Sequence, residues 1–314
     1  MTTPEPEPVY IICNPAAGGG QAARKWEKCY SQLKSRAIPF DFTITQYPGH
    51  ATEIASELLA QGKKRIAVFG GDGTFNEVIQ ALFRDPSIPS TEPVLIYLGA
   101  GSSCDFERVS PHGMPLVERL QSGQPRIADV CKAEYFNFEG NPITRYFINN
   151  SSLGVLSRAG HTFNTATGFY LFLKRISIDL AAIAIGIKTL LEPNEMVCDL
   201  RLDGENLANQ KISNITVFKT PYFAGGMNYG VATALDDGCL HVGIVESTTR
   251  LRLMSMMVSL YTGKIFSRRG TRYHQCRKVE IHTEDRVVVE TDGEIIGYPP
   301  VKYSLIEKAV NVIV

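Results

Sequence analysis

The sequence lacks the features that mark several large classes of protein. Its 314 residues carry 32 Lys and Arg against 32 Asp and Glu, so it has none of the net positive charge expected of a dedicated nucleic-acid-binding protein. Its seven cysteines are scattered without a CxxC pair, which argues against a disulfide framework and against a zinc site. A mean hydropathy of −0.05 excludes a polytopic membrane protein.

Targeting and membrane-spanning segments are also missing from the pattern. The chain starts MTTPEPEP, which contains neither the basic nor the apolar segment of a signal peptide. In the most apolar stretch, the longest uncharged segment is Leu180–Ile187, far shorter than the roughly 18 residues that a membrane span needs. We therefore expect a cytoplasmic protein and no nucleic-acid partner. At roughly 150 residues per domain, the length favours two domains.

The first part of the chain alternates short apolar segments with helical patterns. Strands alternating with helices form a mostly parallel sheet through right-handed crossovers, so residues 1–125 are predicted to form an α/β domain. The predicted strands are Val9–Cys13, Phe40–Thr45, Arg65–Phe69 and Val94–Leu98, and the predicted helices are Gln21–Lys34, His50–Ala60 and Thr74–Phe83.

After residue 125 the pattern becomes rich in β-strand signals. Gly, Asp and Asn separate these segments, which is typical of antiparallel hairpins, so residues 126–300 are predicted to form a β-rich domain. Two helices are expected within it, at Thr167–Leu191 and Leu251–Tyr261. The predicted strands are Arg145–Asn149, Val197–Leu202, Ile212–Lys219, Leu240–Val245, Val279–His282 and Val287–Thr291.

Three glycine-rich turns follow predicted strands of the first domain, at residues 18–20, 70–73 and 99–101. In a parallel sheet such turns share the carboxyl edge, where ligands bind. Glycine lets backbone amides approach an anion closely, and the helix that follows adds favourable partial charge. One such turn is usually only a tight connection, but three at one edge favour an extended ligand that carries phosphate.

The second turn begins the segment GGDGTFNEV, residues 70–78, which carries most of the chemistry. A carboxylate at Asp72, among phosphate-binding amides, makes sense if Mg²⁺ lies between it and the phosphate. Thr74 and Asn76 are candidates to hydrogen-bond phosphate. Glu77 lies in the first turn of a helix, where a negative charge is favourable, so a helix cap and a functional role are equally weighted.

This segment closely resembles the signature of the diacylglycerol kinase catalytic-domain family, which includes bacterial lipid kinases and the sphingosine and ceramide kinases. NAD kinases share its GGDG core more distantly. The resemblance runs over nearly the whole chain, through Asn14-Pro15 and Gly18, Thr45 with Pro48-Gly49-His50-Ala51, Gly101–Arg108, Leu235–Val242 and Asp292-Gly293-Glu294.

The resemblance implies an α/β architecture made of an N-terminal, NAD-kinase-like nucleotide-binding domain and a C-terminal β-rich domain of the β-sandwich kind. Both domains would contribute to the active site, and residues 301–314 would return to the first domain. ATP would be the co-substrate and Mg²⁺ the cofactor. The residues implied to bind nucleotide are Asn14, Thr45, Gly70, Gly71, Asp72, Gly73, Thr74, Asn76, Glu77, Ser102 and Asp105.

Four positions depart from the family pattern. Gly19 stands where the first loop usually carries Lys, so Arg24, Lys25 or Mg²⁺ would have to neutralise phosphate there. Ser102 replaces Thr and keeps the hydroxyl, whereas Cys104 replaces Asn and is a poor hydrogen-bond partner. His241 replaces a frequent Asp.

The late carboxylates have two interpretations. By spacing alone, Asp292-Gly293 is a hairpin turn and Asp236-Asp237-Gly238 is a loop turn. The resemblance instead implies that Glu294 is the general base for the acceptor hydroxyl, with Asp292 beside it and Asp72 as the third catalytic carboxylate. It also implies that Asp237, with the carbonyls of Ala234 and Cys239, holds a second, structural Mg²⁺.

A basic segment suggests how such an enzyme would reach a lipid. Residues 247–279 contain eight Lys and Arg and no Asp or Glu, together with Met254, Met256 and Met257. Cations next to adaptable methionines favour peripheral contact with an anionic membrane surface. A solvated basic face over core methionines explains the same pattern equally well. A homodimer is also left open.

The leading functional hypothesis is an ATP- and Mg²⁺-dependent lipid kinase acting on a hydroxyl of diacylglycerol or a related lipid. A kinase of a soluble substrate, as in NAD kinase, and a catalytically weak regulator that binds lipid or nucleotide are the alternatives. The departures at Gly19 and Cys104 motivate the regulator, and the intact Asp72, Asp292 and Glu294 argue against it.

Overall fold

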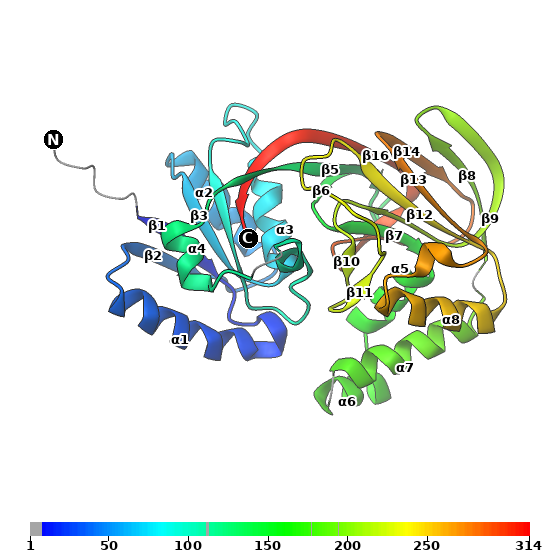
Figure 1. Ribbon diagram of the computed structural model, residues 1–314, viewed down its shortest axis with the longest axis horizontal. Helices are drawn as coiled ribbons and strands as arrows, with labels where there is room; N and C mark the ends of the chain where they lie inside the picture. The colour runs from blue at the N-terminus through cyan, green and yellow to red at the C-terminus, as the bar shows by residue number, and fades with distance from the viewer. Residues whose placement is uncertain (1–7, 111–112, 177, 194) are drawn as a thin grey trace. The chain divides into compact units, whose positions relative to one another are not determined.

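The computed structural model describes residues 8–110, 113–176, 178–193 and 195–314 (Figure 1). The chain divides into two compact units: unit 1 runs to Val130 and includes Ile306–Val314, and unit 2 is Cys131–Leu305. Both divisions fall inside long strands, β5 (Arg126–Phe136) and β16 (Glu294–Ile313). The change of sequence pattern near Pro125 therefore marks the start of a strand rather than a linker.

Unit 1 contains a parallel sheet in the order β16-β4-β3-β1-β2. The end of β16 joins it because Asn311–Ile313 pairs with Val94–Ile96 of β4. The other strands lie within one residue of their predicted ends: β1 (Val9–Cys13), β2 (Phe40–Ile44), β3 (Arg65–Gly70) and β4 (Val94–Gly99).

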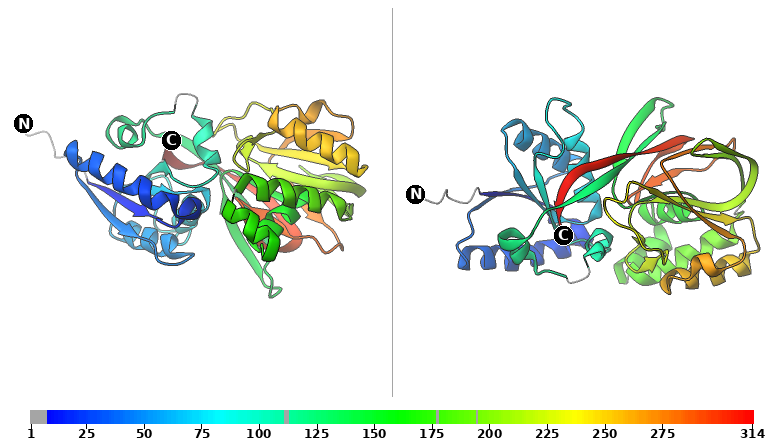
Figure 2. Two further views of the ribbon diagram at one scale, coloured as in Figure 1. Left: turned by 90° about the horizontal axis from the view of Figure 1, so that it is seen from below. Right: turned by 45° about the horizontal axis from the view of Figure 1, so that its top comes forward.

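Helices cover both faces of this sheet. Alternate residues of a strand point to opposite faces, and on β1 Val9, Ile11 and Cys13 pack with α1 and α4, while Ile12 is also fully buried. The other face of the sheet is covered by α2 and α3, which pack on β1 and β3 (Figure 2). The helices are α1 (Gln21–Ser35), α2 (His50–Ala60), α3 (Asp72–Leu82) and α4 (Leu116–Ser122), with short 3₁₀ turns η1 (Ala17–Gly20) and η2 (Asp105–Val109).

Unit 2 is an antiparallel β structure with an apolar core between its strands and a second apolar cluster beneath α7 and α8. Strand β9 pairs with β7, β8 and β12, and β8 and β16 are linked through β14, so that Leu200, Ile215 and Ile281 meet in that core. The strands are β6 (Pro142–Phe147), β7 (Asn150–Gly154), β8 (Met196–Leu202), β9 (Glu205–Phe218), β12 (Leu240–Glu246), β13 (Thr271–Cys276), β14 (Lys278–His282) and β15 (Val289–Thr291), plus a small hairpin of β10 (Tyr222–Phe223) and β11 (Met227–Asn228). The expected combination of an α/β unit and a β-rich unit is confirmed.

The helices of unit 2 differ from the prediction. Where one helix was expected at 167–191, the structure has α6 (Gly168–Ile176) and α7 (Ile178–Leu191), and residue 177 between them lies outside the described residues. Helix α5 (Val155–Asn164) was not predicted, whereas α8 (Arg250–Tyr261) was. A short η3 (Ile265–Ser267) follows α8. Among the described residues, no helix has the length and apolarity needed to cross a membrane.

Candidate functional site

The three glycine-rich turns of unit 1 pack against one another at the carboxyl ends of β1, β3 and β4. A Cβ added to Gly101 would lie 2.5 Å from the Cα of Gly71, and one added to Gly18, whose φ is +61°, would lie 3.2 Å from the carbonyl oxygen of Ala100. Backbone therefore meets backbone, which only glycine permits at this spacing. The gathering of the turns at one edge follows directly from the predicted parallel sheet.

Asn14 and Thr74 join the first turn to the second. The Asn14 Nδ2 donates to Thr74 Oγ1 at 2.9 Å, while Asn14 Oδ1 accepts from the Ala16 amide at 3.0 Å. Thr74 is only 6 % exposed, and a Cβ at Gly70 would lie 2.7 Å from its hydroxyl oxygen. Both side chains thus order the loops, and their assignment to nucleotide binding stays a prediction.

Asp72 bridges the second turn to the third. Its carboxylate accepts hydrogen bonds from the amides of Asp105 at 2.9 Å and Phe106 at 3.0 Å and from the Tyr97 hydroxyl at 3.1 Å. From the sequence pattern, Mg²⁺ was the only partner suggested for this carboxylate. Nothing in the pattern indicates that the carboxylate holds the first turn of η2. A carboxylate has about four acceptor positions, so three bonds leave one for a ligand.

Two of the four departures from the family pattern, Ser102 and Cys104, lie just after the third turn. Cys104 has φ +48°, a left-handed conformation, and its Sγ lies 3.5 Å from the carbonyl oxygen of Gly101. Asn adopts this conformation more readily than other residues, which gives a structural reason for the Asn that the family carries here. Ser102 is exposed, and Asp105 is 6 % exposed with its carboxylate 3.7 Å from Arg108.

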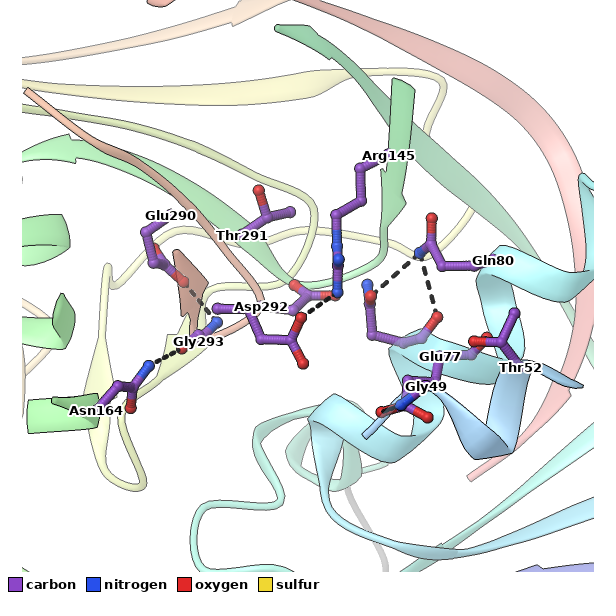
Figure 3. A network of polar contacts seen from close by, with 12 residues as sticks. Gly49, Thr52, Glu77, Gln80, Arg145, Asn164, Glu290, Thr291, Asp292 and Gly293 are labelled. Atoms are coloured by element: carbon purple, nitrogen blue, oxygen red, sulfur yellow. Dashed lines mark hydrogen bonds and ion pairs between the residues drawn. The ribbon is translucent and has the colours of Figure 1, made fainter. Parts of the chain in front are cut away.

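Glu77 caps a helix, but a neighbouring one rather than its own. Its two carboxylate oxygens accept from the amides of Gly49 at 3.0 Å and Ala51 at 3.1 Å, at the start of α2, and its backbone oxygen accepts from Thr52 (Figure 3). A carboxylate is favourable at a helix N-terminus. The cap predicted for its own helix is thus found on α2 instead, and a role of Glu77 toward a nucleotide stays a prediction.

Two further nucleotide candidates of unit 1 are Asn76 and Thr45. Asn76 is 1 % exposed and accepts from Gln80 Nε2 at 3.1 Å. The Thr45 amide donates to the Cys13 carbonyl at 2.9 Å, which extends the pairing of β1 with β2. Their side-chain roles toward a nucleotide stay predictions.

In unit 2, Asp292 and Gly293 form the two-residue turn of the β15–β16 hairpin. Thr291 pairs with Glu294, and the turn residues have φ of +47° and +88°, as a type I′ turn requires. The Asp292 carboxylate, 9 % exposed, accepts from three successive amides, Ile148 at 3.2 Å, Asn149 at 3.1 Å and Asn150 at 3.0 Å. The hairpin and a fixed anion therefore coexist at this position.

Glu294 lies beside a cation that the sequence analysis overlooked. It forms an ion pair with Arg145 of β6, and the side chains of Glu294 and Arg145 are 43 % and 21 % exposed. Arg145 was noted only as the start of a predicted strand, because nothing in its sequence neighbours indicates a partner 149 positions away.

A second overlooked residue is Glu290. It is 7 % exposed, accepts from Ser152 Oγ at 2.6 Å and from the Gly293 amide, and burial raises the pKa of its carboxyl to about 7 (Figure 3). Asn164 Nδ2 donates to the Gly293 carbonyl at 2.8 Å, so both the N–H and the C=O of Gly293 are hydrogen-bonded. The hairpin that carries Glu294 is thus fixed from several sides.

The residues predicted to hold a structural metal do come together, but around a lysine. Lys219 Nζ donates to Asp237 Oδ1 and lies 3.4 Å from the Cys239 carbonyl oxygen. Ala234 turns its amide, not its carbonyl, to Asp237, at 3.0 Å. In the part of the chain that the structure describes, no group of three or more His, Cys, Asp and Glu side chains could hold a metal ion.

Comparison with known families accounts for this architecture. The diacylglycerol kinase catalytic domain matches residues 8–133, and the YegS C-terminal NAD kinase beta sandwich-like domain matches residues 164–314. The chain therefore carries a diacylglycerol kinase catalytic domain followed by a YegS-type C-terminal domain. The resemblance drawn from GGDGTFNEV is thereby confirmed, and the catalytic-domain match supports a kinase.

Individual relatives are distant but cover the whole chain. The chain is 23 % identical over 299 residues to a Bacillus subtilis protein named "Putative lipid kinase YtlR", covering 93 % of this chain and 94 % of that one. It is 24 % identical to the "Diacylglycerol kinase" of Staphylococcus aureus, covering 96 % and 90 % of the two chains. A crystal structure described as "a putative diacylglycerol kinase from Bacillus anthracis str. Sterne" shares the fold, with a TM-score of 0.75, 23 % identity and coverage of 98 % and 97 %.

Proposed function

We propose that this kinase transfers the γ-phosphoryl group of ATP to a hydroxyl of diacylglycerol or a related lipid. The names of its relatives support a lipid acceptor, as does the intact GGDGTFNEV and DGE pair of motifs. The observation that carries the proposal is an apolar surface on unit 2, which a soluble acceptor would not require.

This apolar surface lies on α6, α7 and α8, which pack beside one another in that order. Exposure reaches 80 % for Leu251, 65 % for Phe169 and 64 % for Val258, and large exposed apolar patches mark interaction sites. Arg250 and Arg252 flank Leu251 on α8, so cations accompany the apolar side chains as anionic lipid would favour. The exposed members are Phe169, Leu171, Phe172, Ile176, Leu180, Ile183, Ile187, Leu191, Leu251, Met254, Val258 and Tyr261.

An apolar cavity lies beneath α7 and α8. It has a volume of about 50 Å³ and is lined by α5, α7, α8 and the strands beneath them, with Leu190, Met256 and Met257 among its walls. Methionine adapts to irregular apolar partners. Met256 is buried in the apolar core beside this cavity and Met257 packs against that core, as expected of core methionines, whereas Met254 is 44 % exposed.

In this proposal, nucleotide binding is the role of unit 1 and proton acceptance is the role of unit 2. Unit 1 binds ATP through the amides of its glycine turns, and Mg²⁺, which neutralises developing phosphate charge, would arrive with ATP and be held by the free acceptor position of Asp72. Unit 2 supplies Glu294, which would accept the proton of the lipid hydroxyl. Asp292 keeps the hairpin under Glu294 in place, so its role is to position the base.

The acceptor can be tested directly. Purified protein with Mg²⁺ and γ-labelled ATP is offered diacylglycerol in mixed micelles, and in parallel NAD without lipid. We expect label in the lipid fraction and none in the dinucleotide. Label in NAD would favour the soluble-substrate alternative, and nucleotide binding without transfer to any member of a lipid panel would favour the regulator.

Peripheral membrane contact is tested separately by co-sedimentation with anionic vesicles. Leu251→Asp and Val258→Asp place charge on the apolar surface and are expected to weaken vesicle binding strongly. Ile143→Asp, at a side chain that is 44 % exposed on β6, serves as the matched control and should bind as the wild type does. Equal binding by all three variants would contradict a docking role for α8.

A further inference from the structure

A buried lysine lies where the family resemblance places a metal ion. Lys219, at the end of β9, has a side chain that is 0 % exposed, and its ammonium donates to Asp237 Oδ1. The same ammonium lies 3.4 Å from the Cys239 carbonyl oxygen. Asp237 and the Cys239 carbonyl were the predicted metal ligands, so the cation they meet belongs to the chain itself.

The acceptor positions of Asp237 are taken up by protein donors. Its Oδ2 accepts from the Ala234 amide and His241 Nε2, both at 3.0 Å, and its Oδ1 also accepts from the Cys239 amide at 3.1 Å. The side chain is only 24 % exposed. With four donors aimed at one carboxylate, no oxygen lone pair is left to ligate an ion.

The charges of Asp237 and Lys219 also disfavour a divalent ion at this turn. The Asp237 carboxylate and the Lys219 ammonium already neutralise each other as an ion pair. His241 Nδ1 is held by the Tyr273 hydroxyl at 2.6 Å, which fixes the ring. A divalent ion would stand in contact with an ammonium in a largely buried site, which electrostatics disfavours strongly.

We infer that the ammonium of Lys219 replaces the divalent ion as the cation that braces this turn, so that unit 2 folds without a structural metal. The residues implied to hold Mg²⁺ do not fit it in this chain. His241, where the family frequently has Asp, belongs to the same replacement, because a ring N–H donor now faces Asp237 where a second carboxylate would favour a metal.

Hydrogen bonds connect the segment around Lys219 to the hairpin that carries Glu294. The Lys219 amide donates to the Asn149 carbonyl at 2.8 Å, the Thr220 hydroxyl donates to Asn149 Oδ1 at 3.0 Å, and the Asn149 amide donates to Asp292. The bonds to Asn149 come from the Lys219 backbone and from Thr220, so the Lys219 side chain acts on Asp292 indirectly, by anchoring this segment to Asp237. In that sense Lys219 is a positioning residue for Asp292.

Metal dependence of thermal stability tests the replacement without using kinase activity. Wild-type protein, free of nucleotide, is melted with Mg²⁺ alone and with a chelator, and the two midpoints are expected to coincide. A specific site filled 100-fold above its Kd would instead raise Tm by roughly 5 to 10 °C. A Mg²⁺-dependent rise that Asp237→Asn abolishes and Asp236→Asn retains would overturn the inference.

A double-mutant cycle tests the pair itself. Lys219→Met leaves a carboxylate without its cation, so Tm should fall on the order of 10 °C, whereas Lys302→Met at an exposed lysine of β16 should change it little. Adding Asp237→Asn to Lys219→Met should recover part of the loss, and strict additivity of the two losses would refute the pairing. Should Lys219→Met fail to fold, the metal measurement on wild type still decides.

The positioning role rests on the proposed kinase activity and has its own readout. Lys219→Met is expected to lower kcat at unchanged KM for ATP, because the nucleotide turns lie in unit 1. An unchanged kcat would remove the positioning role and leave the metal-free turn standing.

Discussion

The buried carboxyl of Glu290 makes unit 2 sensitive to pH. Burial raises its pKa from the ordinary 4.5 to about 7, and the bonds from Ser152 and Gly293 do not offset that burial. Between pH 4.5 and about pH 7, the Glu290 carboxyl is therefore mostly protonated in the folded state and mostly ionised in the unfolded state. Stability contributed by this group is fully present below pH 4.5 and is lost as pH rises through about 7.

The size of the effect follows from the difference between the two pKa values. Each unit of difference corresponds to about 1.4 kcal/mol, so the free energy of unfolding should fall by about 2 to 3 kcal/mol between pH 5 and pH 8. Glu290→Gln mimics the protonated carboxyl, because its amide can donate to Ser152 and its oxygen can accept from Gly293. This variant should lack that part of the pH dependence.

The assay is urea unfolding followed by circular dichroism across this pH range. Wild type and Glu290→Gln should have similar stability near pH 5 and diverge as pH rises, with the variant the more stable at pH 8. Glu284→Gln, at an exposed glutamate of the same unit, should run parallel to wild type. A constant difference between wild type and Glu290→Gln from pH 5 to pH 8 would refute the reasoning.

Three other substitutions test the loops and the hairpin. Asp292→Asn removes a charge that accepts from three amides, and urea unfolding should show a loss of about 1 to 3 kcal/mol, while no loss would contradict the role of that carboxylate as a fixed anion. Cys104→Asn suits φ +48° better and should raise stability by about 0.5 kcal/mol; a lower melting midpoint would speak against the conformational argument. Gly101→Ala brings a Cβ against Gly71 and should cost about 1 to 3 kcal/mol and weaken ATP binding in calorimetry, with wild-type affinity as the contrary result.

Local patterns predicted the parallel sheet of unit 1 well. Its strands are continuous apolar segments ended by glycine turns, so strand identity and the edge at which the turns meet both follow from the sequence. The positions of the glycine turns were also predicted correctly. The backbones of Gly71 and Gly101 approach so closely that both positions require glycine, whatever the ligand. The motifs shared with the diacylglycerol kinase catalytic domain added a prediction of kinase chemistry.

What escaped prediction depends on partners distant in sequence. Strand β13, TRYHQC, is polar and pairs only with β12 at the edge of the sheet, so it shows no apolar alternation. Arg145 and Lys219 meet Glu294 and Asp237 through the folding of unit 2, and neither lies in a motif. The donors around Asp72 come likewise from another turn, which is why its carboxylate suggested only a metal.

The most direct measurement of the central claim compares Glu294→Gln with Glu284→Gln in transfer of labelled phosphate from ATP to diacylglycerol in mixed micelles. If Glu294 is the base of a lipid kinase, its variant should lose about 100-fold or more in kcat and still bind ATP, while the control should match wild type. Full transfer activity in Glu294→Gln would contradict the account, as would a wild-type protein that labels no lipid.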